Sequence, residues 1–258
     1  MLGGLALIPQ GLNFQEFKNL AKVVDSSDLE IPGYVPKSLA ISEAVLSDEE
    51  KQRGVLILDI TSENTELVFW KDGVLQTIKA IDRAGKQMDC QLAEKLNVDI
   101  LDAEKLKRQY GSLQDPANPD ELIPLVERDG RQIRQIRRSE FYTVFIEVCR
   151  PWFDQLFEEV RAFVQSQGSQ YPHFVFTGGG AAMDGLIEFI FKEYSVVARI
   201  GLTKHVEAPT ELLVDPSMTH ALGMFRWIAT SYQEQRQIIQ PNGFFEKTFA
   251  SARDWYPG

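Results

Sequence analysis

The stretch Gly54-Val-Leu-Ile-Leu-Asp59-Ile60 decides the fold of this chain. It is short and nearly all apolar, as expected for a strand whose two faces are both buried in a sheet. A carboxylate, Asp59, stands at the end of the run. Sheets buried on both faces carry helices on either side, so the stretch predicts an α/β architecture.

Two further β-rich runs follow at Thr65–Trp70 and Val74–Ile78. They are joined across Lys71-Asp72-Gly73, and Asp-Gly is a strong hairpin signal because glycine tolerates a positive φ. Three consecutive strands are therefore expected to begin a mixed sheet.

The middle of the chain is mainly helical in pattern. Helices are expected over Gly85–Leu96 and Asp102–Tyr110, the second with Asp102 as its N-cap and Gly111 as its stop. A second hairpin, with strands at 122–127 and 132–136, is expected around Asp129-Gly130, away from the first sheet.

A long helix and a further α/β unit complete the pattern. The apolar period from Ser139 to Gly168 predicts one helix, which Pro151 should kink because proline removes a backbone donor and crowds the preceding turn. A strand at His173–Thr177 and a tight turn at Gly178-Gly179-Gly180 come next, followed by a helix, a strand and a final helix at 181–193, 196–200 and 218–232. This order predicts an α/β fold with a small α+β insertion.

Composition excludes several classes of protein. The 258 residues are 44% hydrophobic and carry a net charge of −10, the wrong sign for nucleic-acid binding, which needs clustered Lys and Arg. Cys90 and Cys149 are far apart, so neither a disulfide scaffold nor a zinc site is expected, and the cytosol is the default location. The apolar residues 1–8 are too few to span a bilayer and lack the basic start of a signal peptide.

The Gly178–Gly180 turn is the first candidate site, because backbone N–H groups between a strand and a helix can converge on an anion. Met183 stands where the dinucleotide-binding fingerprint needs glycine, and Gly85-Lys86 is followed by Gln87 rather than Ser or Thr, so no P-loop is present. The alternative is a turn that lets strand and helix pack closely. No histidine pair or Gly-x-Ser-x-Gly elbow occurs, and neither catalytic nor metal-ligating residues are expected.

Together these motifs resemble the second half of the bacterial cell-division protein FtsA family, which is actin-like. The resemblance runs from about Leu39 to Trp227 and implies an actin-like, ribonuclease-H-like mixed sheet flanked by helices. The pilus-assembly relative PilM shares this skeleton. The resemblance rests on the order and spacing of these segments: 54–60, the hairpin at Asp72-Gly73, 83–86, 102–111, 176–186, 198–201 and 219–223.

The resemblance implies a nucleotide held between two lobes, with strand-turn hairpins on the phosphates and a late glycine turn plus a helical Glu and Lys on the adenosine. The turn after Asp59 and the triple-glycine turn must then lie side by side at one edge of the sheet. Carried over, the candidate cofactor-binding residues are Asp59, Thr61, Ser62, Glu104, Lys107, Gly178, Gly179 and Gly180.

The second phosphate loop departs from the family. Three glycines and a threonine are replaced by Thr61-Ser62-Glu63-Asn64, whose side chains crowd the space that glycines leave for phosphate oxygens. Glu63 adds up to about 4 kcal/mol of repulsion at contact with a triphosphate. The first phosphate loop has no counterpart here. ATP hydrolysis by this chain alone is therefore not expected; the residues call for no cofactor, and the resemblance leaves ATP with magnesium open.

Three regions are expected along the chain. Residues 1–38 form a helix and connector, 39–232 the second actin-like lobe with an insertion at about 86–138, and 233–258 a linker and an amphipathic helix. The tail aromatics Phe244, Phe245, Phe249 and Trp255 suit a membrane surface, whereas its cancelling charges suit a tail folded on the core or buried in an oligomer equally well.

The resemblance gives three hypotheses for the function. The first is an FtsA-like scaffold or adaptor that links division proteins to the inner face of the cytoplasmic membrane, with an FtsZ-like protein or FtsA-like neighbours as partners. The alternatives are an actin-like ATPase completed by a separate first lobe, and a PilM-type pilus-assembly adaptor.

Overall fold

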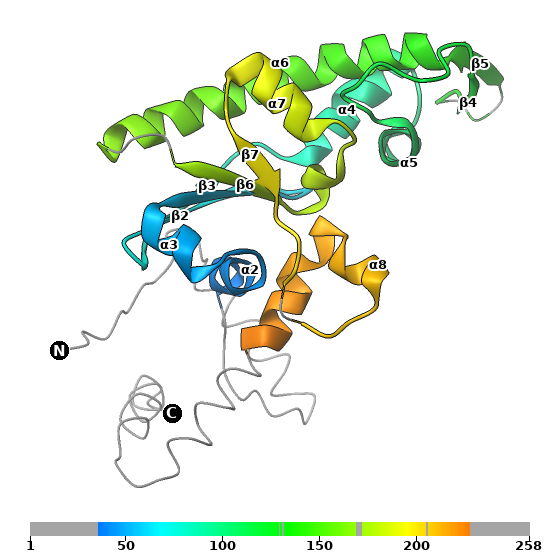
Figure 1. The fold of residues 1–258 in the computed structure, drawn as a ribbon. Coiled ribbons are helices and arrows are strands. Elements are labelled where there is room, and N and C mark those ends of the chain that lie inside the picture. Colours follow the sequence, from blue (N-terminus) through cyan, green and yellow to red (C-terminus); the bar gives the residue numbers. More distant parts are fainter. Residues whose placement is uncertain (1–35, 129, 131, 169–171, 205, 228–258) are drawn as a thin grey trace, which may run out of the picture.

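The computed structural model describes residues 36–227 except 129, 131, 169–171 and 205 (Figure 1). The N-terminal segment at 1–38 is expected to hold a helix at Glu16–Asp28, and this helix, the linker and the aromatic tail lie outside the described residues. No helix within the described part is both long and apolar enough to cross a membrane.

A five-stranded mixed sheet in the order β3-β2-β1-β6-β7 forms the centre of the molecule, as predicted. Strand β1 lies in its middle with all six residues buried, antiparallel to β2 and parallel to β6. Asp72 and Gly73 both have positive φ at the β2–β3 turn, as an Asp-Gly hairpin requires. The strands are β1 (Val55–Ile60), β2 (Thr65–Lys71), β3 (Val74–Ile81), β6 (His173–Thr177) and β7 (Ala198–Ile200).

The larger core lies on the face of the sheet covered by α4 (Gly85–Leu96), α6 (Arg138–Ser166) and α7 (Leu186–Tyr194) (Figure 1). Helix α6 continues through Pro151, with buried side chains on both sides of it. An internal proline costs about 3 kcal/mol, whereas each buried large apolar side chain contributes about 1.5–3 kcal/mol. The apolar stripe of α6 therefore outweighs the proline.

The opposite face of the sheet is covered by α2 (Lys37–Val45) and α3 (Asp48–Arg53), and a helix at 219–227 packs on α2. Their smaller core gathers around Ile41, Ile57 and Val175, and the Trp70 indole N–H donates to the Ser42 hydroxyl over 2.9 Å. The sheet is thus covered on both faces, as the apolar β1 sequence predicts.

The carboxyl end of α2 is held by segments that come much later in the chain. The backbone N–H of Lys204 donates to Ala44 O over 2.9 Å, and the Arg199 guanidinium donates to Val45 O over 2.7 Å. The Arg226 guanidinium donates to Glu43 O. Carbonyls that a helix end would leave without partners are therefore satisfied.

The insertion holds α5 (Ile100–Tyr110) and a separate two-stranded sheet, β4 (Leu122–Val126) with β5 (Ile133–Arg137), as expected. Two expected helix starts are wrong. Helix α5 is capped by Asp99, whose carboxylate accepts from Leu101 N over 2.9 Å, whereas Asp102 pairs with Lys105. The helix expected from Ala181 begins at Leu186, because a 3₁₀ turn, η1 (Gly179–Ala182), comes first.

Two short helices lie between β7 and the last helix. They are α8 (Thr210–Leu213) and the 3₁₀ turn η2 (Pro216–Met218), which contacts η1. The segment brings Pro216 and Thr219 onto the end of β6: the Thr177 and Thr219 hydroxyls lie 2.7 Å apart.

Candidate functional site

The turns after β1 and β6 lie side by side at one end of the sheet. In the parallel register Asp59 is opposite Thr177, so both strands end at the same edge. A Cβ placed on Gly178 would lie 2.5 Å from both Asp59 Oδ1 and Ile60 O. The juxtaposition that the resemblance requires is therefore present.

The three glycines of the second turn differ in what surrounds them. Gly178 has φ +80° and ψ 175°, a region in which only glycine is at ease, and its N–H donates to Pro216 O over 3.1 Å. A Cβ on Gly180 would lie 2.7 Å from Ile60 Cβ, whereas one on Gly179 would meet nothing within 4 Å. Close packing therefore explains why glycine stands at Gly178 and Gly180. Of the three glycines, only Gly179 faces open space.

The turn after β1 is closed on itself. The Thr61 hydroxyl donates to Asn64 O over 2.8 Å and accepts the N–H groups of Glu63 and Asn64 at 3.3 and 3.2 Å. One donor and two acceptor positions are all that a hydroxyl has. Ser62 is exposed, and its carbonyl accepts from Lys86 N over 3.1 Å.

The amino end of α4 is also occupied by this turn. Gly85 N donates to Thr61 O over 2.8 Å, next to the Lys86–Ser62 bond. These first N–H groups of a helix are the ones that could otherwise bind an anion. Neither is directed at a ligand in this arrangement.

Glu104 and Lys107, one turn apart on α5, have different partners. The Lys107 amine lies 2.6 Å from Asp89 Oδ1 and donates to Gly85 O over 3.2 Å, so it faces α4. Burial raises the pKa of Asp89 even though Lys107 opposes this. Glu104 accepts from Arg108 over 2.7 Å at the surface. Lys107 is thus close to the Thr61 turn, and the two residues do not act as a pair.

Lys37 is the residue at this edge that sequence reasoning missed. Its amine lies 2.7 Å from Asp59 Oδ2 and 3.4 Å from Glu66 Oε2. Burial alone would lower the pKa of this amine, but the two carboxylates outweigh it and raise the pKa. The antiparallel pairing of Asp59 with Glu66 could have signalled that a cation is needed, although not which one.

A magnesium nucleotide would need free carboxylate, amide and amine groups at this edge of the sheet. Asp59 is bound by Lys37, the amides of the Thr61 turn are used within the turn, and Lys107 is bound by Asp89. Within the described residues no group of three or more His, Cys, Asp or Glu side chains is placed to hold a metal ion. In this arrangement the edge does not fit a magnesium nucleotide; of the three glycines in the turn, only Gly179 has open space where a side chain would stand.

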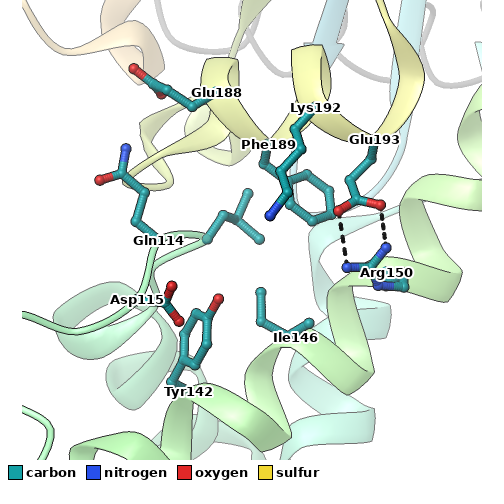
Figure 2. A pocket seen from close by; sticks show the side chains of 10 residues that line it. Gln114, Asp115, Tyr142, Ile146, Arg150, Glu188, Phe189, Lys192 and Glu193 are labelled. Atoms are coloured by element: carbon teal, nitrogen blue, oxygen red, sulfur yellow. Dashed lines mark hydrogen bonds and ion pairs between the residues drawn. The ribbon is translucent and has the colours of Figure 1, made fainter.

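A cavity of about 210 Å³ lies elsewhere, between α6, α7 and the loop after α5 (Figure 2). Figure 2 shows the Lys192 amine directed into it, with Asp115 and Tyr142 on the other side. An Arg150–Glu193 ion pair closes one flank. None of the predicted site residues lines this cavity.

Comparisons with protein families and with individual sequences agree with each other. Residues 56–223 match the family model described as cell division protein FtsA. The chain is 26% identical to the FtsA protein of Pseudomonas aeruginosa over 81% of this chain and 50% of that protein. It is 25% identical to that of Escherichia coli K12 over 92% and 57%. The chain spans about half the length of these relatives.

Solved structures with the same fold are more distant in sequence. MreB5 of Spiroplasma citri bound to ADP superposes with a TM-score of 0.66 at 18% identity, covering 88% of this chain and 69% of that one. The PilM-PilN type IV pilus biogenesis complex gives a TM-score of 0.58 at 21% identity, covering 80% and 56%. Both confirm the predicted actin-like fold.

Proposed function

The chain belongs to the FtsA family of cell division proteins, and from this premise we propose that it acts as a scaffold or adaptor rather than as an ATPase. The single observation that carries the proposal is the closed turn Thr61–Asn64. Its two inner N–H groups and its hydroxyl are all used within the turn. Phosphate binding would have to break these bonds and bring Glu63 next to an anion.

The proposed partners are an FtsZ-like division protein and FtsA-like neighbours, as in the family. The insertion at 86–138 is the proposed meeting surface, within a lobe at 39–232 that follows the segment at 1–38. Residues 233–258 are proposed to bring the protein to the inner face of the cytoplasmic membrane, with Phe244, Phe245, Phe249 and Trp255 as the inserting side chains.

Calorimetry and co-sedimentation test this proposal on the full chain. We expect no heat of binding for ATP with Mg²⁺, and we expect the chain to sediment with FtsZ polymers. Replacing Phe245 and Trp255 by Glu should abolish binding to anionic vesicles and leave FtsZ binding intact. Micromolar ATP binding, or no FtsZ binding, would contradict the scaffold proposal.

One observation favours the second candidate, an ATPase completed by a separate first lobe. Gly179 faces open space at the edge where the resemblance places adenosine, so the adenosine side is less obstructed than the phosphate side. We therefore propose a direct comparison, in which the first lobe of a relative is added in trans. ATP turnover that appears only in the mixture, and is lost in Gly179→Val, would favour the enzyme.

The PilM-type adaptor shares the fold, so the fold does not separate it from a division scaffold. Its support is the similarity to PilM in the solved complex. Co-purification with an inner-membrane pilus protein, in place of FtsZ, would favour it.

A further inference from the structure

Lys37 connects the first turn of α2 to the end of the central strand. Its amine lies 2.7 Å from one oxygen of Asp59 and 3.4 Å from one oxygen of Glu66. The carboxylates are 4% and 16% exposed, whereas the Lys37 side chain is 34% exposed. The cation therefore covers two carboxylates that lie deeper than itself.

The two carboxylates need a cation because of where the strands place them. Asp59 and Glu66 are direct partners across the antiparallel β1–β2 pair, so their side chains leave the same face of the sheet. Like charges directly opposite each other destabilise a sheet. Burial raises the pKa of Glu66, Lys37 opposes this rise and Asp59 adds to it.

Lys37 stands at a position that helix electrostatics disfavours. It is the first residue of α2, where the helix macrodipole presents positive charge, and the first turn has no acidic residue. Pro36 precedes it without a capping side chain. The favourable partners of this ammonium are thus on the strands, and its placement is explained by the two carboxylates.

We propose that Lys37 is a built-in counter-ion that closes this edge of the sheet to free divalent cations, and that removing it opens a site for Mg²⁺ or Mn²⁺ on Asp59 and Glu66. Hard divalent cations prefer carboxylate oxygens, and the two strands already hold two such groups together. In the wild type, burial and Lys37 lower the pKa of the nearby His220 and outweigh Asp59, which raises it, so the amine of Lys37 is the cation of this cluster. The proposal goes beyond the scaffold function and does not depend on it.

The test is Mn²⁺ binding to the full chain at pH 7.5, without nucleotide, followed by electron paramagnetic resonance. Lys37→Met should bind one Mn²⁺ with a Kd of about 10⁻⁴–10⁻³ M, the range of weak carboxylate sites. The wild type and Lys37→Arg should bind at least roughly tenfold more weakly, because both keep the cation. Lys37→Met with Asp59→Asn should lose the site.

Stability gives a second readout if Lys37→Met folds poorly. The double variant Lys37→Met with Asp59→Asn removes the opposed charges together, so it should be more stable to urea than Lys37→Met alone. Mn²⁺ should stabilise Lys37→Met and not the double variant.

Three outcomes would overturn the proposal. They are Mn²⁺ binding by the wild type that Asp59→Asn abolishes, no gain of Mn²⁺ binding in folded Lys37→Met, and a double variant as unstable as Lys37→Met. Equal instability of the double variant would mean that Lys37 acts through the packing of its aliphatic chain and not through its charge. Because no nucleotide, FtsZ or membrane is present, none of these outcomes bears on the scaffold proposal.

Discussion

Two adjacent glycines of the turn after β6 face opposite surroundings. Gly178 adopts a backbone conformation that other residues avoid and touches the end of β1, whereas Gly179 has open space where a side chain would stand. The sequence alone does not distinguish these two glycines. The difference between them becomes visible only in the structure, where β1 lies against Gly178.

Alanine substitutions should therefore give unequal results. Gly178→Ala should lower the free energy of unfolding by about 2 kcal/mol or more, because of its φ and its contact with Asp59. Gly179→Ala should stay within about 0.5 kcal/mol of the wild type. Urea unfolding measures both, and equal losses would show that the turn is not packed as described.

Glu50 joins the capping box of α3 to the strand β7. Its carboxylate accepts from Ser47 N over 2.9 Å and lies 2.7 Å from an Arg199 nitrogen. Partial burial would raise the pKa of Glu50, but Ser47 and Arg199 outweigh it and hold the pKa below its ordinary value of 4.5. Because the folded pKa is the lower one, this stabilisation is present above pH 4.5 and is lost as pH falls through the folded pKa.

Glu50→Gln should accordingly cost about 1 kcal/mol at pH 7. The difference in free energy of unfolding between Glu50→Gln and the wild type should shrink once the pH falls below the folded pKa of Glu50. Urea unfolding across the acid range measures this, with Glu49→Gln as control, since Glu49 pairs with the exposed Arg53. If the difference in unfolding free energy did not change with pH, the charge of Glu50 would not be what stabilises the folded protein.

The candidate site was predictable at single residues only in part. The positions of Asp59 and the glycine turn follow from strands that the apolar pattern reveals. The partners of these residues do not, because Lys37 and Pro216 reach the site from distant parts of the chain. Asp99 and Asp102 offer the same capping chemistry three residues apart, and only the backbone geometry shows that Asp99 is the cap.

At the scale of elements, the helix at 219–227 packs backbone to backbone on α2. A Cβ on Gly223 would lie 2.6 Å from the carbonyl carbon of Ala40 and 3.2 Å from Ala44 Cβ. Arg226, one turn later, binds the end of the same helix. The absence of a side chain at Gly223 thus sets how closely the two helices approach.

Gly223→Ala should separate these helices and lower the free energy of unfolding by about 1–3 kcal/mol. Hydrogen exchange should show lost protection in 219–227 and in α2, and unchanged protection in α6 on the other face. Ala221→Ser, at an exposed position of the same helix, is the control and should leave exchange unchanged. Uniform loss of protection would argue against a local contact.

Elements whose signals are local were predictable. The Asp-Gly hairpin, the insertion hairpin and the strand at His173–Thr177 are confirmed because turn chemistry and apolar runs act over a few residues. The start of α7 does not follow from local sequence, because η1 precedes the helix and contacts η2, about 35 residues later. Local propensity does not contain such a contact.

For the whole molecule, two cores on opposite faces of one sheet predict cooperative unfolding. Cys149 is fully buried on α6 in the larger core, and burial raises the pKa of its thiol far above the usual range. Cys90, on α4, is exposed. These are the two cysteines of the chain.

Iodoacetamide should therefore label one thiol of the native protein, at Cys90, and both in urea. The slow labelling of Cys149 should follow the global free energy of unfolding, which mass spectrometry after timed labelling measures. Cys90→Ser should remove the fast label and leave the slow one. Fast labelling of Cys149 would show that the larger core opens locally.

The bonds that close the carboxyl end of α2 also bear on how the protein is made. The ribosome releases α2 before the groups that complete its last turn, which belong to residues 199, 204 and 226. Until those residues emerge, the nascent α2 has bare carbonyls and lacks the helix that covers it. The layer beneath the sheet can therefore be finished only after residue 226 has been made, and chaperones would meet this layer, rather than the one containing α6, in its unfinished form.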